Sequence, residues 1–199
     1  MTAVIEKVTG YVTRNSDSGA PELLVFQPVD VGVQVPAGTV EPGEDIDAAA
    51  LREVMEETGL TGLRPVRFLG SIEVPLTDES RAPLQDTVIR HSPGLEYGIG
   101  IYVPRAYWLR VVDRLDDYAK VEVPGHNGWL RAAALADRMD RYFYHFEATG
   151  PTPQRWQIQD EGHPPWECFW VPLSPRPELD HEPQAWKDEY YDKLLASIG

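Results

Sequence analysis

Three glutamates stand close enough in the sequence for their carboxylates to act jointly on one ligand. They are Glu53, Glu56 and Glu57, and Arg52 directly precedes them. On a helix, which turns by about 100° per residue, the three carboxylates fall within an arc of roughly 100°. Like charges at this density repel, and a hard divalent cation such as Mg²⁺ or Mn²⁺ would offset the repulsion. The spacing therefore indicates a metal site of the kind that also coordinates substrate phosphates.

The residues before these glutamates could hold them in place. Arg52 lies among the acids, where its guanidinium can orient a carboxylate through a bidentate contact. Gly38 and Gly43 enclose a loop that leads through Glu44 into the acidic segment. A solvated helix face is the alternative interpretation of such a run of glutamates. The glycines, the upstream acid and the arginine together favour a functional site.

A helix over residues 46–58 is predicted to present the carboxylates. Asp45 is a suitable N-cap, because its carboxylate can accept a hydrogen bond from a backbone N–H of the first turn. Gly59 is placed to end the helix in a left-handed conformation. The apolar positions form an adjoining arc that would face the core, namely Ile46, Ala50, Leu51, Val54 and Met55.

Strands are predicted on both sides of this helix, where the pattern of apolar residues fits a sheet. Val31, Val33 and Val35 alternate with other residues and predict a strand that ends at Pro36. Residues 63–74 are predicted to form one strand or a pair of short ones, and the other predicted strands cover residues 8–13, 21–28, 142–146, 156–159 and 166–173.

Residues from about 77 to 140 are harder to interpret, because polar runs and Pro-Gly turns interrupt them. Within them residues 129–139 have a helical pattern, as do residues 181–198 near the end of the chain. The segment from 77 to 140 could be a surface elaboration, a contact in a homodimer, a lid or a wall of the substrate site. Long connecting segments are often functional but not always, so these alternatives stay open.

Composition limits the classes of function. The 199 residues suffice for one domain with a sizeable core. A formal net charge of −14 argues against a general binder of nucleic-acid phosphates and against an anionic membrane surface as partner. Cys168 is the single cysteine, which excludes an intramolecular disulfide and a cysteine-based zinc site. The sequence has no signal-peptide pattern and no long apolar run, so we expect a cytoplasmic protein.

Residues 38–60 fit the spacing G-x5-E-x7-R-E-U-x-E-E-x-G-U, where U is a bulky apolar residue. This pattern resembles the Nudix box, the signature of hydrolases that cleave a diphosphate linked to another moiety. The resemblance implies a single Nudix hydrolase domain over residues 1–199. Its fold would be α/β, with a mixed β-sheet sandwiched between α-helices (α/β/α) and an insertion at about 77–140.

The resemblance also implies a set of metal ligands. In the family, the glutamates that match Glu53, Glu56 and Glu57 bind one to three divalent cations, Mg²⁺ or Mn²⁺. The residue before the box glycine often adds its backbone carbonyl, and Ala37 holds that position here.

The reaction implied by the resemblance is attack of water on a phosphorus atom. Glu53 is a predicted catalytic residue. The arginine that matches Arg52 steadies a glutamate, and the acid that matches Glu44 supports the loop or the water network. The general base varies in the family and is either a box glutamate or an acid on a late loop. Glu161 and Glu167 are the late candidates, and Glu161 could also be an additional metal ligand.

The expected substrate is a small nucleotide, such as an ADP-ribose-like compound, a nucleotide sugar or a nucleoside triphosphate. Pro75 lies 15 residues after Leu60, a placement that resembles a marker of ADP-ribose hydrolases. A tyrosine that resembles a marker of dinucleoside-polyphosphate hydrolases is absent, because Thr77 and Asp78 stand in its region. Four aromatic side chains could stack on a nucleobase or belong to the core, namely Tyr144, Trp156, Trp166 and Trp170.

Two other functions remain open. A protein of the same fold could bind nucleotides as a non-catalytic sensor. It could also act as a pyrophosphohydrolase on RNA 5′ ends, although the acidic charge disfavours this, and we expect no nucleic-acid partner.

Overall fold

A computed structural model describes residues 3–29, 31–94, 100–159, 164–180 and 184–198, with the backbone alone at 184 and 185. The chain divides into two compact units. The first comprises Lys7–Ser71 and Arg141–Gly199 and is called the α/β unit below. The second comprises Met1–Glu6 and Ile72–Asp140 and is called the β unit.

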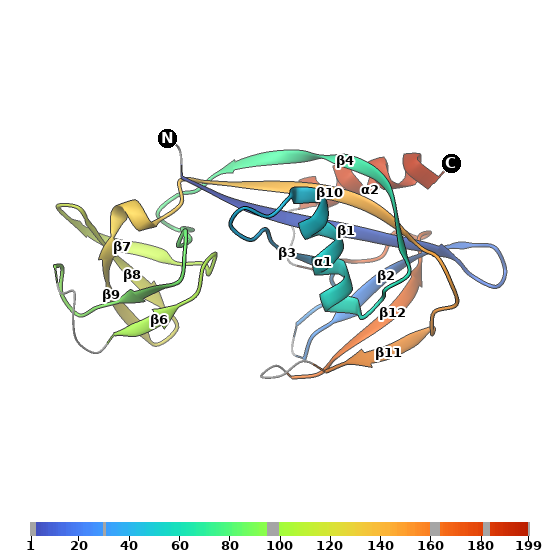
Figure 1. Cartoon of the computed structure of the whole chain (residues 1–199), viewed down its shortest axis with the longest axis horizontal. Coiled ribbons are helices and arrows are strands. Elements are labelled where there is room, and N and C mark those ends of the chain that lie inside the picture. The colour runs from blue at the N-terminus through green and yellow to red at the C-terminus, as the bar shows by residue number, and fades with distance from the viewer. Residues whose placement is uncertain (1–2, 30, 95–99, 160–163, 181–183, 199) are drawn as a thin grey trace. The chain divides into compact units, whose positions relative to one another are not determined.

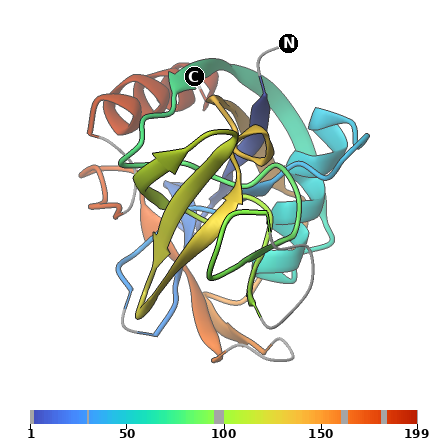
Figure 2. The same cartoon turned by 90° about the vertical axis from the view of Figure 1, so that its left-hand side faces the viewer.

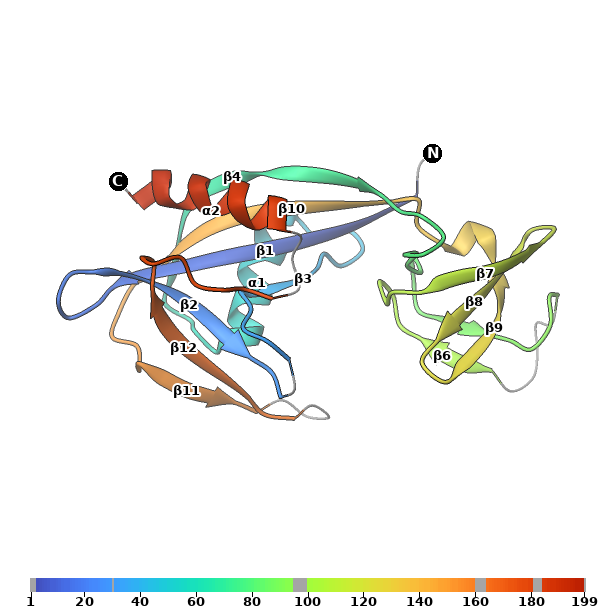
Figure 3. The same cartoon turned by 180° about the vertical axis from the view of Figure 1, so that it is seen from behind.

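A seven-stranded sheet dominates the α/β unit, with strand order β11-β12-β2-β1-β10-β4 and with β3 also paired to β1. Helix α1 lies on one face of this sheet and helix α2 on the other (Figures 1 and 3). This arrangement confirms the predicted α/β fold with a sheet between helices. The elements are β1 (Val4–Asn15), β2 (Pro21–Gln27), β3 (Ala37–Thr39), α1 (Ile46–Thr58), β4 (Leu63–Pro75), β10 (Arg138–Ala148), β11 (Arg155–Ile158), β12 (Trp166–Pro172) and α2 (Gln184–Ile198).

Side chains of alternating direction join the sheet to both helices. Val8 and Val12 of β1 belong to the same buried cluster as Val54 of α1. Against the other face, the ring of Phe143 stacks on Tyr190 of α2 with ring centroids 3.6 Å apart. Each face of the sheet thus packs against a helix. The packing of Val54 with Val8 and Val12 fixes α1 against β1.

The β unit has a hydrophobic core of its own. Its strands are β5 (Thr87–Ile89), β6 (Ile101–Val103), β7 (Arg110–Leu115), β8 (Tyr118–Val123) and β9 (His126–Arg131). They form the pair β5-β6 and the sheet β7-β8-β9 (Figure 2, yellow-green strands). Eight buried side chains pack together there, namely Ile89, Val103, Leu109, Val111, Ala119, Val121, Leu130 and Leu135. The description of the chain as one domain with an insertion at about 77–140 stays a prediction.

The predicted helix over residues 129–139 is wrong. Strand β9 continues to Arg131, and a single 3-10 turn (Ala132–Ala134) leads to β10. Leu130 lies opposite Ala119 of β8 and is buried in the core of the β unit. Strand pairing and burial therefore override the helix propensity of the alanines.

The predicted strand over residues 31–35 is also wrong, because the strand begins later, at Ala37. In the 31–35 segment Gln34 forms an isolated bridge with Phe26, and the carbonyl of Val33 accepts from the N–H of Asp180. The segment thus bonds to two different partners rather than along one ladder. The other predicted strands and the helix over 46–58 appear in the structure within a few residues of their expected bounds, and the last predicted helix is seen as Gln184–Ile198. The first three residues predicted for that helix, 181–183, lie outside the described residues.

Candidate active site

Helix α1 presents the glutamates because the local sequence fixes both of its ends. Asp45 is the N-cap, and its carboxylate accepts hydrogen bonds from the backbone N–H groups of Asp47 and Ala48 at 3.0 and 3.1 Å. Gly59 ends the helix with a φ of 69°, and its N–H donates to the carbonyl of Met55 at 2.8 Å. Both caps confirm the prediction from sequence.

Two of the glutamates reach from α1 to the backbone of β3. The N–H of Ala37 donates to Oε2 of Glu57 at 2.8 Å, and the N–H of Thr39 donates to Oε1 of Glu53 at 3.0 Å. Gly38 lies between these two donors. The contact seen at Ala37 involves its N–H, so the expected role of its carbonyl as a metal ligand stays a prediction.

Arg52 contacts three carboxylates at once. Its Nε and Nη2 donate to the two carboxylate oxygens of Glu44 at 2.7 and 2.8 Å, which is the bidentate geometry expected from the sequence. Its Nη1 donates to Oε2 of Glu56 at 2.9 Å and lies 3.0 Å from Oε1 of Glu53. Arg52 therefore fixes the side chains that lie at the entry of α1 and along its acidic face.

Burial and neighbouring charges shift the pKa values of this cluster. Hydrogen bonding from Arg52 lowers the pKa of Glu44 to about 2. Burial raises the pKa of Glu57 to about 8, and the charges of Glu53 and Glu56 act in the same direction. Burial also raises the pKa of Glu53, although Arg52 opposes this shift. The ionised form of Glu57 is thus destabilised in the protein alone, and a cation would stabilise it.

The three glutamates line one pocket of the α/β unit, with a volume of about 380 Å³. This volume lies within the range of small-molecule sites in proteins. The remaining wall is apolar and is formed by Phe26, Pro28, Val29, Pro164 and Trp166. A pocket with carboxylates on one side and an apolar wall on the other suits a ligand that combines a charged group with a weakly polar one.

Two indole groups close the C-terminal end of α1. The Nε1 of Trp166 donates to the carbonyl of Glu57 at 2.7 Å, and the Nε1 of Trp156 donates to the carbonyl of Thr58 at 2.7 Å. The thiol of Cys168 lies 3.5 Å from the same Glu57 carbonyl. These groups satisfy helix carbonyls that have no partner within the helix. The sequence pattern indicated the aromatic residues but not these contacts.

The other two aromatic candidates have structural contacts. Trp170 is 3% exposed, and the guanidinium of Arg14 lies 4.4 Å from the centroid of its ring. The hydroxyl of Tyr144 donates to Asp47 at 2.5 Å, next to the N-cap of α1. Of the four aromatic residues named from the sequence, Trp166 is the one that lines the carboxylate pocket.

Of the two acids predicted from the late part of the sequence, Glu167 is described by the structure and Glu161 is not. Glu161 lies outside the described residues, so its predicted role as base or metal ligand stays a prediction. Glu167 is paired with Arg155 on the neighbouring strand. Because side-chain direction alternates along a strand, Glu167 points away from the face of β12 that carries Trp166 and Cys168 toward α1. The structure therefore does not bring Glu167 to the glutamate cluster.

The donor set of the pocket fits a hard divalent cation. Glu53, Glu56 and Glu57 offer carboxylate oxygens, the ligand type that Mg²⁺ and Mn²⁺ prefer. Within the residues that the structure describes, no three acidic, histidine or cysteine side chains already stand in metal-binding geometry. Glu53 and Glu57 instead accept backbone N–H groups, so a cation would compete with the amides of Thr39 and Ala37.

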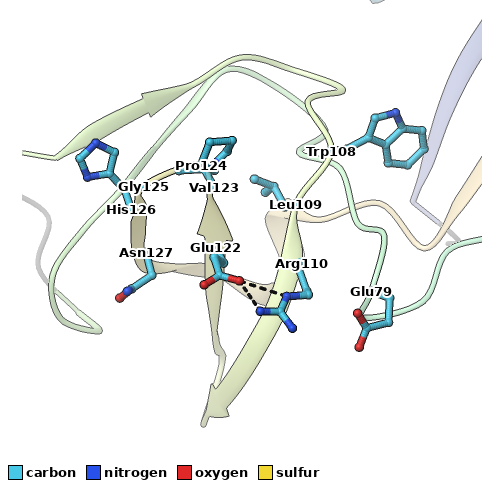
Figure 4. A pocket seen from close by; sticks show the side chains of 10 residues that line it. All are labelled: Glu79, Trp108, Leu109, Arg110, Glu122, Val123, Pro124, Gly125, His126 and Asn127. Atoms are coloured by element: carbon cyan, nitrogen blue, oxygen red, sulfur yellow. Dashed lines mark hydrogen bonds and ion pairs between the residues drawn. The ribbon is translucent and has the colours of Figure 1, made fainter. Parts of the chain in front are cut away.

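A second pocket lies in the β unit and has a volume of about 570 Å³ (Figure 4). Arg110 and Glu122 form an ion pair among its lining residues, and Trp108 and His126 lie apart from each other in the same view. Its acidic side chains, Glu79 and Glu122, do not converge as the glutamates of α1 do. We therefore regard the pocket of the α/β unit as the candidate active site.

Known proteins resemble parts of this chain in sequence. Residues 7–92 match the family model described as NUDIX domain. An ADP-ribose pyrophosphatase of Saccharomyces cerevisiae is 48% identical over 50 residues. This alignment spans 22% of the chain and 22% of the yeast protein.

Several solved structures align with this chain at low sequence identity. A C. elegans Ap4A hydrolase in a binary complex has a TM-score of 0.49 at 16% identity, covering 98% of this chain and 97% of that one. A hydrolase from M. smegmatis has a TM-score of 0.47 at 12% identity, covering 97% and 85%. A MutT protein from Methanosarcina mazei has a TM-score of 0.45 at 14% identity, covering 100% and 98%. At these values the likeness does not bear on function.

Proposed function

We propose, from the match of residues 7–92 to the family model described as NUDIX domain, that the chain hydrolyses a phosphoanhydride bond in a nucleoside diphosphate linked to another moiety. The observation that carries the proposal is the pocket in which Glu53, Glu56 and Glu57 meet an apolar wall. The carboxylates suit a metal-bound diphosphate, and the apolar wall suits a weakly polar group of the substrate.

Mg²⁺ or Mn²⁺ is the proposed cofactor, held by Glu53, Glu56 and Glu57 with the carbonyl of Ala37. When bound, such a cation neutralises phosphate oxygens and acidifies a coordinated water. The presence of three carboxylates in the lining of one pocket supports this assignment, because Mg²⁺ and Mn²⁺ prefer oxygen ligands.

The side chains of the protein have distinct tasks in this reaction. Arg52 keeps Glu53 and Glu56 in place and is itself fixed by its bidentate contact with Glu44. Water forms a new bond to phosphorus, the bridging P–O bond breaks, and the leaving phosphate departs with the bridging oxygen. The proton of the water passes to a carboxylate base, which is a glutamate of α1 or Glu161.

An ADP-ribose-like compound is the substrate class that we propose first. Its support is the similarity to a yeast ADP-ribose pyrophosphatase over 50 residues, together with the position of Pro75 after the acidic helix. Nucleotide sugars and nucleoside triphosphates follow as alternatives, because they present the same phosphoanhydride group to the metal.

A panel of nucleotides, incubated with Mg²⁺ or Mn²⁺ and analysed by mass spectrometry, tests the proposal. ADP-ribose should yield AMP and ribose 5-phosphate only when the divalent cation is present. Binding of the same nucleotides without any product would reject the enzyme and leave the sensor. If triphosphorylated RNA were the one compound of the panel to be hydrolysed, and if its hydrolysis slowed as salt increased, the RNA 5′-end activity would be favoured instead.

The remaining expectations from the sequence keep the status of predictions. They are a cytoplasmic location, the absence of a nucleic-acid partner and a homodimer. Across the part of the chain that the structure describes, no helix combines the length and the apolar content that crossing a bilayer needs.

A further inference from the structure

Trp166 has two contacts that no other described residue combines. Its indole N–H donates to the main-chain carbonyl of Glu57 at 2.7 Å. Trp166 also lines the pocket that Glu53, Glu56 and Glu57 line. One residue therefore contacts both the backbone of Glu57 and the space that a ligand would fill.

The bond to Glu57 meets a specific electrostatic need of α1. The last turn of this helix carries Glu56 and Glu57 and no basic residue. Acids in the last turn are unfavourable, because the free carbonyl groups there already form the negative end of the helix dipole. A cationic cap would satisfy these carbonyls but would also compete with a metal for the glutamates. A neutral indole N–H satisfies the carbonyl without adding charge.

We propose that Trp166 is a positioning residue for Glu57, holding the main chain of this residue so that its carboxylate stays directed at a divalent cation in the pocket. The inference rests on the proposed function, because it assumes that the pocket binds a cation. Hydrogen bonds that orient metal ligands from outside typically change metal affinity by about 10- to 100-fold when they are removed. Trp166 would act less directly, because it bonds to the main-chain carbonyl of Glu57 and not to the carboxylate that would bind the metal.

Trp156 provides a matched control on the neighbouring strand. Its indole N–H donates to the carbonyl of Thr58, also at 2.7 Å, one residue beyond Glu57. Both indoles are partly buried against the same hydrophobic cluster. Trp156 differs in that it does not line the carboxylate pocket and is not bonded to a glutamate. Loss of either N–H should cost similar stability, while loss of the Trp166 N–H alone should change metal binding.

The experiment compares the parent chain with Trp166→Phe and Trp156→Phe. Mn²⁺ binding is measured by the loss of the free-ion EPR signal, and stability by urea unfolding without metal. We expect Trp166→Phe to weaken Mn²⁺ binding by about tenfold and Trp156→Phe to leave it within about twofold. The Mn²⁺ concentration that gives half of the maximal activity should rise by about tenfold in Trp166→Phe and should stay within about twofold of the parental value in Trp156→Phe.

A second substitution isolates the hydrogen bond from the ring. Incorporation of 3-benzothienylalanine at position 166 replaces the N–H by sulfur and preserves the bicyclic ring. It should reproduce the loss of Mn²⁺ affinity even if the phenylalanine variant folds poorly. Equal Mn²⁺ affinity in the parent and the benzothienyl protein would overturn the role of Trp166, and so would an equal loss in the Trp156 variant. A parent chain that binds no Mn²⁺ would instead reject the proposed function itself.

Discussion

The carboxylate of Glu53 lies against the backbone of Gly38 so closely that a Cβ at position 38 would come within 1.9 Å of its Cδ. The N–H of Thr39, the next residue, donates to the same carboxylate. Only glycine at position 38 therefore leaves room for the Glu53 carboxylate to contact β3. The requirement is steric, because Gly38 does not have a positive φ.

Gly38→Ala should reduce turnover by about 100-fold, because displacement of a catalytic group by about 1 Å can have an effect of this size. The measurement is kcat/KM at saturating Mg²⁺, with circular dichroism to establish that the fold is retained. Gly62→Ala is the matched control, since a Cβ there would meet its nearest atom at 3.4 Å. Near-parental activity of Gly38→Ala would show that Glu53 need not approach the backbone.

Glu57→Gln should preserve the fold and remove most of the activity. The substitution keeps the volume of the side chain but removes the charge that would hold the cation. Calorimetric titration with Mn²⁺ and a turnover assay measure the two effects. Asp17→Asn in the exposed turn between β1 and β2 controls for the general loss of one negative charge. Activity within about threefold of the parent would contradict a metal ligand at Glu57.

Mn²⁺ affinity should rise as pH increases from about 6 to above 8. Burial raises the pKa of Glu57 to about 8, so protons compete with the cation below that value. Turnover at subsaturating Mn²⁺ should follow the same direction, because only the metal-loaded fraction reacts. Titrations at constant ionic strength measure the trend. An affinity that is independent of pH across this range would exclude Glu57 from the ligand set.

Arg52→Lys should lower turnover by about tenfold while the protein stays folded. Lysine keeps the positive charge but cannot form the paired contacts that the guanidinium makes with Glu44. Glu53 and Glu56 would then lose a shared, fixed donor. Arg67→Lys, at an exposed position of β4, is the control for the exchange itself. Unchanged turnover in Arg52→Lys would show that the positive charge at position 52 matters and the paired hydrogen bonds to Glu44 do not.

Stability should fall as pH decreases from about 6.5 to 4, in part through His145. Thr13 Oγ1 lies 2.8 Å from its Nε2 and Ser197 Oγ lies 2.7 Å from its Nδ1. Burial lowers the pKa of His145 to about 4, from about 6.5 in an unfolded chain. Between these values the unfolded state binds more protons, so acid favours unfolding by up to about 3 kcal/mol.

Urea unfolding at pH 7, 5 and 4 measures this contribution. His145→Gln should flatten the dependence of unfolding free energy on pH, while His126→Gln, at an exposed position, should not. Parallel pH curves for the parent and His145→Gln would show that the pKa of His145 is the same in the folded and the unfolded protein.

Features with a local cause could be predicted from the sequence. The bounds of α1 follow from Asp45 and Gly59, whose effects act within a few residues. The helix predicted at 129–139 was wrong because pairing of β9 with β8 decides the conformation of Leu130. In the same way, the glutamates of the candidate site were visible as a spacing on one helix. The role of Trp166 was not, because it depends on the register of β12 against β2 and on how α1 packs across that sheet.

The contact between β3 and α1 also depends on a match between two spacings, that of two amides on the strand and that of two carboxylates on the helix. The amides of Ala37 and Thr39 are two residues apart on a strand, a step of about 6.6 Å. Glu53 and Glu57, which accept from them, are four residues apart on a helix, a rise of about 6 Å. A separation of two residues on the strand therefore nearly equals a separation of four residues on the helix. One residue gained or lost within 37–39 should therefore turn an amide away from its carboxylate.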